Sequence, residues 1–119
     1  MAASGSLGRC HYFKGEFVAS NLCLILTPKN KDEVEMKFYA KYLNMLREQI
    51  VEDLADGASK LTIDEEELKK YRIKSINKDK QKQIVEKMLK SEEIIKQKEE
   101  ELIKIKNELD ADFLDFIER

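Results

Sequence analysis

The chain has 119 residues, of which 42% are hydrophobic and 39% charged, with 22 Lys and Arg against 24 Asp and Glu. This length fits one small domain with a helical extension rather than two domains. The net charge of −2 excludes a protein that binds nucleic acid through a strongly basic overall charge. Any contact with DNA must therefore come from locally placed cations.

Several function classes lack their signatures in this sequence. The two cysteines, Cys10 and Cys23, and the single histidine, His11, are too few for a zinc site and predict free thiols in a reducing cytoplasm. No glycine-rich phosphate loop and no Ser-His-Asp set is present, and no apolar run approaches the ~20 residues of a membrane span. We expect a cytoplasmic protein with no catalytic residues, no metal, no cofactor and no membrane partner.

The N-terminal part predicts a lead followed by strands. Residues 1–8 are small and polar and predict a flexible lead, either a cloning remnant or the tail of a glycine-rich loop. Short aromatic and β-branched runs in 10–27 predict two or three strands with Lys14-Gly15 as a turn. The apolar run 22–26 predicts a strand covered on both faces, and residues 29–32 predict a polar turn.

The next segment has a helical period. It predicts one helix over 34–54, with Asp32 as its N-cap and Gly57 as its stop. Its expected inner face comprises Val34, Phe38, Tyr42 or Leu43, Leu46, Ile50 and Leu54.

Three short elements are expected after this helix. Residues 59–63 predict an extended piece, and residues 65–70 a helical turn capped by Thr62 or Asp64. Residues 71–76 alternate and predict a final strand with Tyr71, Ile73 and Ile76 partly inward.

Residues 79–119 contain neither proline nor glycine, and their apolar residues return every three or four positions. This pattern predicts one helix about 60 Å long, whose apolar stripe needs a partner helix. Because Ser91, Lys98 and Asp112 interrupt one of its two seams, an irregular helical pair or bundle is favoured over a uniform zipper. The expected helix-pairing interface comprises Ile84, Met88, Ile95, Leu102, Ile105, Leu109 and Phe116. The fold class expected from all elements is α+β, a small mixed strand and helix domain followed by one long C-terminal helix that pairs with another helix.

The order of these elements carries a family resemblance. Gly57, Ser59 and Ile63 form a G-x-S-x-x-x-I turn, and 81–85 (QKQIV) opens the long helix. Over residues 9–119 the chain resembles the distal half of a target-recognition domain with its attached helix in the specificity subunits of type I restriction–modification systems. The specificity domains of fused restriction–methyltransferase enzymes are similar. The family's recognition domain is longer and its helix has a proline-rich start, so a fragment, a truncated gene product or one piece of a split specificity protein is expected.

The resemblance implies a domain plan and partners. Residues 1–8 would be the lead, 9–77 a partial DNA target-recognition domain, and 78–119 a spacer and assembly helix. The implied function is a non-catalytic DNA sequence-recognition component that positions methyltransferase and nuclease subunits on a target site. Its partners would be double-stranded DNA, methyltransferase (modification) subunits, and a second copy or another specificity helix.

The DNA-contact residues expected from the resemblance and from the candidate loops are Arg9, Lys14, Lys29, Lys31, Ser59 and Lys60. For each lysine the alternative role is a solubilising surface charge. The alternative function is a non-catalytic helical oligomerisation or interaction module without DNA binding, and a remnant of a disrupted gene is a third reading.

Overall fold

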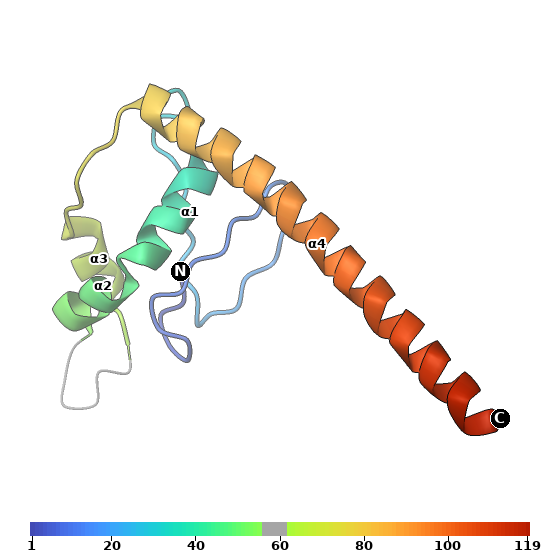
Figure 1. The fold of residues 1–119 in the computed structure, drawn as a ribbon. Helices are drawn as coiled ribbons and strands as arrows, with labels where there is room; N and C mark the ends of the chain where they lie inside the picture. The colour runs from blue at the N-terminus through green and yellow to red at the C-terminus, as the bar shows by residue number, and fades with distance from the viewer. Residues whose placement is uncertain (56–61) are drawn as a thin grey trace. The chain divides into compact units, whose positions relative to one another are not determined.

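The computed structural model describes residues 1–55 and 62–119, and its regular elements there are four helices (Figure 1). They are α1 (Met36–Met45), α2 (Arg47–Leu54), α3 (Glu65–Lys70) and α4 (Lys78–Glu118). The chain divides into two compact units, an N-terminal unit (Met1–Val85) and a distal helix unit (Glu86–Arg119).

The expected α+β class is wrong for the part of the chain that the structure describes. No sheet forms there, and the β-type pairing consists of two isolated antiparallel bridges, Ala2 with Cys23 and Ala55 with Ile63. The segment 22–26 is not covered on both faces, because Leu22 is 57% exposed and Ile25 60% exposed. Aromatic and β-branched residues favour extended backbone, but a stable sheet also needs several paired strands with a shared buried face. Segments 10–27 and 71–76 meet the first requirement and not the second.

The helix expected over 34–54 is present as two helices. α1 begins at Met36 after Glu35, not after Asp32, and Leu46 interrupts the helix with φ −89° and ψ 1° before α2 begins. The expected inner face is confirmed, since Phe38 and Ile50 are buried and the other members of that set are at least half-buried. The expected stop at Gly57 lies outside the described residues.

The core of the N-terminal unit is small. Leu7, Ala55 and Ile63 form a buried cluster, against which Val51 and Leu54 of α2 and Leu68 of α3 pack, together with Met1 and Leu24. The backbone of Gly8 packs closely against α2, because a Cβ at this position would lie 3.0 Å from Val51 Cγ2. Its φ of +79° also favours glycine. Residues 1–8, expected as a lead, thus contribute Leu7 and Gly8 to the packing against α2.

α3 has the predicted bounds, and the structure decides between its two candidate caps. The side chain of Asp64 accepts a hydrogen bond from Glu67 N at 3.3 Å, so Asp64 rather than Thr62 is the N-cap. Lys69 pairs with Glu65 and Glu66 on the same short helix.

Tyr71 connects the end of α3 to α2. Its hydroxyl donates to Asp53 Oδ2 at 2.6 Å, and Gln49 Nε2 donates to Asp53 Oδ1 at 2.9 Å. These hydrogen bonds lower the pKa of the Asp53 carboxyl, and the one from Tyr71, helped by burial, raises the pKa of Tyr71 to about 12.

We predict that Tyr71 ionises later than an ordinary tyrosine, whose pKa is about 10. Because the raised pKa belongs to the folded state, the hydrogen bond adds its small stability below about pH 10 and loses it as the pH rises through about 12. An ultraviolet titration of tyrosinate should show one late tyrosine that disappears in Tyr71→Phe and shifts down in Asp53→Asn. A late tyrosine that persists in Tyr71→Phe would contradict the assignment.

The long helix is confirmed within one residue of its expected start. α4 runs 41 residues without interruption, and the side chain of Asn77 accepts from Lys80 N at 2.9 Å, which caps its first turn. Within the described residues, no helix combines the length and the apolar character that crossing a membrane requires.

Candidate functional site

Arg9 lies on a stretch of backbone that is fixed on both sides. Arg47 Nε donates to Leu7 O at 2.7 Å, and the side-chain amide of Asn44 bonds both Cys10 N (2.7 Å) and Cys10 O (2.8 Å). The Arg9 side chain itself is exposed. The helices α1 and α2 therefore hold the backbone beside Arg9 and leave its guanidinium open to solvent.

Lys14 lies in a turn that is flanked by two stacked aromatic rings. Gly15 has φ +90°, a conformation that favours glycine, and it follows Lys14 directly. The rings of Phe13 and Phe17 stack across this turn with centroids 5.6 Å apart and planes 27° apart. Lys14 is exposed between two aromatic side chains that are 63% and 48% exposed themselves.

Lys29 and Lys31 lie around the predicted polar turn, which the structure confirms. Asn30 organises it, because its Oδ1 accepts from Asp32 N at 3.0 Å and its carbonyl accepts from Glu33 N at 3.2 Å. Both lysine side chains are exposed.

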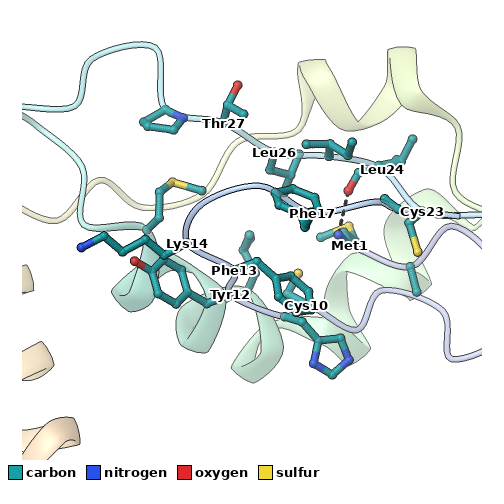
Figure 2. Close-up of a pocket in the computed structure, with 18 of the residues that line it drawn as sticks. Met1, Cys10, Tyr12, Phe13, Lys14, Phe17, Cys23, Leu24, Leu26 and Thr27 are labelled. Atoms are coloured by element: carbon teal, nitrogen blue, oxygen red, sulfur yellow. Dashed lines mark hydrogen bonds between the residues drawn. The ribbon is translucent and has the colours of Figure 1, made fainter.

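Three of the expected DNA-contact residues come together at one hollow. Arg9, Lys14 and Lys31 all line a hollow of about 830 Å³ in the N-terminal unit, while Lys29 is not among its lining residues. Figure 2 shows its labelled wall residues coming from Met1 and from two stretches of chain, 10–17 and 23–27. We call this feature the basic hollow.

The electrostatics of the basic hollow favour an anionic ligand. Among the described residues that line it, Glu35 is the one carboxylate, and its Oε1 lies 3.1 Å from Lys78 Nζ. Because Lys78 neutralises Glu35, Arg9, Lys14 and Lys31 leave the lining with a net positive charge. The aromatic residues Tyr12, Phe13 and Phe17 line the same hollow.

Charge is distributed unevenly along the N-terminal unit. Residues 9–31 carry four Lys or Arg and one carboxylate, whereas residues 48–67 carry eight carboxylates and one lysine. Ser59 and Lys60, the two other expected DNA contacts, belong to the acidic stretch and lie outside the described residues. The sequence therefore favours 9–31 over 48–67 as a region that approaches a polyanion.

The expected pairing interface on α4 is open to solvent. Ile84, near the start of the interface, is 41% exposed. The members that follow Met88 are more exposed: Ile95 (54%), Leu102 (56%), Ile105 (59%), Leu109 (66%) and Phe116 (75%). Leu89, Ile94 and Ile103 widen the stripe and are also about half exposed. Within the distal helix unit, nothing among the described residues covers this stripe.

Sequence reasoning missed Gln81. This residue was expected only as part of the helix start, but its side chain is 1% exposed and fully hydrogen-bonded. A signal was present, because Gln81 lies seven residues before Met88 on the same seam as Ile95 and Leu102. A polar residue in line with an apolar seam indicates a buried amide with specific partners.

In the described part of the chain, the cysteines and the other possible metal ligands form no metal site. Both cysteines are free, and burial raises the pKa of the Cys10 thiol, which donates to Gly8 O at 3.6 Å. Across residues 1–55 and 62–119, no group of three His, Cys, Asp or Glu is placed to hold a metal ion.

Comparison with known protein families gives a match over most of the chain. The family model described as type I restriction modification DNA specificity domain matches residues 1–107. No curated protein and no solved structure matches the chain.

Proposed function

Because the chain belongs to the type I restriction–modification DNA specificity domain family, a non-catalytic family that recognises DNA sequence, we propose that it contacts double-stranded DNA through the basic hollow and assembles with other subunits through α4. The observation that carries the DNA part is the convergence of Arg9, Lys14 and Lys31 on one hollow whose single described carboxylate is already paired. Arg9 and Lys14 come from the stretch that leads into the Gly15 turn, and Lys31 comes from the loop before α1.

The basic hollow offers both kinds of contact that a sequence-reading protein needs. Cationic side chains bind phosphates and fix the register of the protein on the duplex, while base edges are read by shorter and more specific contacts. Arg9, Lys14 and Lys31 would serve the first purpose. The exposed rings of Phe13 and Phe17 suit apolar contact with base edges, such as a thymine methyl group.

Removing the three cations should weaken DNA binding and reduce its salt dependence. Each phosphate contact contributes about 0.9 to the slope of log K against log salt concentration. We expect the triple variant Arg9→Ala, Lys14→Ala, Lys31→Ala to lower that slope by about 2 to 3 units. Fluorescence anisotropy with random duplexes at low and moderate salt measures it, with and without a methyltransferase subunit present.

The control for this measurement is Lys70→Ala. Lys70 is an exposed lysine of α3, next to an acidic first turn, so its loss should leave the slope unchanged. If the triple variant binds DNA with the wild-type slope, the basic hollow is not the contact surface. If the wild type shows no binding at low salt even with the subunit present, a pure interaction module is favoured instead.

For assembly, we propose that α4 pairs with another α4. A single helix exposed on all sides is marginally stable in water, since most helical stability in proteins comes from packing of the apolar face. The half-exposed side chains of Ile95, Leu102 and Leu109 return at intervals of seven residues and provide such a face. A second copy of the chain carries the matching stripe.

Charge along α4 favours an antiparallel pair. Residues 80–90 carry four lysines and one glutamate, whereas residues 108–118 carry five carboxylates and no cation. Antiparallel pairing sets the basic end of one helix opposite the acidic end of its partner, and parallel pairing would set like charges together. Two recognition units would then be held at opposite ends of a helical spacer of fixed length.

The end of α4 is the surface we propose for the methyltransferase subunits. Four large apolar side chains lie within five residues there, and each is at least 57% exposed: Phe113, Leu114, Phe116 and Ile117. They extend around more of the helix than a single pairing seam requires, because Leu114 lies nearly opposite the face that carries Leu109 and Phe116. These additional exposed apolar side chains support a contact with a protein other than the paired helix.

A further inference from the structure

The start of α4 is attached to the loop before α1 by a buried amide. Gln81 Oε1 accepts from Glu35 N at 2.7 Å, and Gln81 Nε2 donates to Glu33 O at 3.1 Å and to Ile76 O at 2.7 Å. Both donors and the acceptor of the amide are therefore used. Because the side chain is 1% exposed, loss of these bonds would leave the Gln81 amide buried without partners.

Lys78, one turn earlier on α4, binds the same loop. Its ammonium donates to Lys31 O at 3.2 Å and lies 3.1 Å from Glu35 Oε1. Gln81 and Lys78 are three residues apart and therefore share one face of the helix. Together they hold residues 31–35 at three backbone atoms and at the Glu35 carboxylate, a set of contacts that we call the α4 clamp.

The loop has little else to define its shape. Glu35 precedes α1 as its N-cap residue, yet no side chain makes a capping bond there. The Asn30 turn fixes the beginning of the loop, and the α4 clamp fixes its end. Lys31, one of the three cations of the basic hollow, follows Asn30 directly, and its own carbonyl accepts from Lys78 in the clamp.

We propose that Gln81 is a positioning residue for DNA recognition: it holds the 31–35 loop so that Lys31 faces the ligand of the basic hollow. The inference rests on the proposed function, since it assumes that Lys31 contacts a DNA phosphate. Gln81 touches no DNA in this account, and its effect passes through the backbone of Glu33 and Glu35. The clamp lies entirely within the N-terminal unit.

The first experiment is a double-mutant cycle between Gln81→Leu and Lys31→Ala in the full chain. Gln81→Leu retains most of the side-chain volume and removes all three hydrogen bonds. We expect each single variant to weaken binding to a duplex at low salt by about tenfold and to lower the salt slope by about 0.9. The double variant should be no weaker than either single one, because both remove the same contact.

The matched control is Gln83→Leu, which changes an exposed glutamine two residues further on and should bind like the wild type. A clamp that only stabilises the fold would lower the folded fraction, leave the salt slope of the folded protein unchanged, and give additive losses with Lys31→Ala. Additive losses would overturn the inference. If Lys31→Ala alone had no effect, the proposed role of the hollow would fail instead, so the two failures are distinguishable.

A second variant keeps the test valid if Gln81→Leu does not fold. Gln81→Glu preserves the acceptor for Glu35 N but places a carboxylate against the carbonyls of Glu33 and Ile76. Protonation at acidic pH restores one donor, so DNA affinity relative to the wild type should recover as the pH falls. Gln83→Glu should show no such recovery, and a pH-independent defect in Gln81→Glu would contradict the role of the amide.

Discussion

A chain carrying Ile95→Asp and Leu102→Asp is expected to sediment as a monomer at concentrations where the wild type is a dimer. Both side chains lie on the exposed seam of α4, where burial of each against a partner contributes about 2 kcal/mol. A symmetric pair contains four such side chains, so their loss removes roughly 8 kcal/mol, which is about six orders of magnitude in Kd. Four buried carboxylates would oppose association further. Analytical ultracentrifugation over a range of concentrations measures the effect.

The control variant is Gln97→Asp with Asn107→Asp. It introduces the same two residues and the same change in charge at exposed positions away from the seam, so it should remain a dimer. A wild type that is monomeric at all concentrations, with α4 still helical by circular dichroism, would remove the main support for pairing. A control variant that also becomes monomeric would show that charge, rather than the apolar seam, governs association.

The helical elements could be predicted because their signals are local. The absence of proline and glycine from 79–119, with apolar residues at every third or fourth position, gave the bounds of α4 to within a residue. The candidate caps Thr62 and Asp64 likewise predicted the helical turn Glu65–Lys70. Each of these signals depends on neighbours within a few positions along the chain.

The extended segments could not be predicted in this way. Whether Leu22 and Ile25 join a sheet depends on a partner that local sequence does not identify. Among the described residues, this segment makes a single bridge, from Cys23 to Ala2. The interruption at Leu46 was missed for a similar reason. The apolar period continues through it, and backbone contacts rather than periodicity define where α1 ends.

Sequence reasoning selected candidate residues for the site but did not predict how they are arranged. Family resemblance and loop position selected Arg9, Lys14 and Lys31, but only the structure brings these three to one hollow and leaves Lys29 out of its lining. The residues that hold them, Asn44, Arg47 and Gln81, act through the backbone of distant segments. Hydrogen bonds from a side chain to the backbone of a distant segment produce no recognisable spacing in the sequence. Gln81 is an exception, because it is a polar residue in line with an apolar seam.

Changing the length of α4 should change the spacing of the DNA sites that an assembled pair recognises. Deleting residues 96–102 removes one heptad, so the apolar stripe keeps its phase while the helix shortens by about 10 Å. At about 3.4 Å per base pair, two recognition units at opposite ends of an antiparallel pair should then select half-sites about three base pairs closer together. Selection from a pool of duplexes with variable spacers, using the chain assembled with its methyltransferase subunit, measures the preferred gap.

The matched variant duplicates residues 96–102 and should lengthen the preferred gap by the same amount, so the two changes predict opposite shifts. A parallel pair would hold both recognition units at one end, where helix length does not affect the gap, and neither variant would then change it. Because the lysines of 80–90 and the carboxylates of 108–118 both remain in each variant, the charge pattern that favours antiparallel pairing is preserved. Opposite shifts of about three base pairs therefore require that α4 acts as a spacer and that its two copies run in opposite directions.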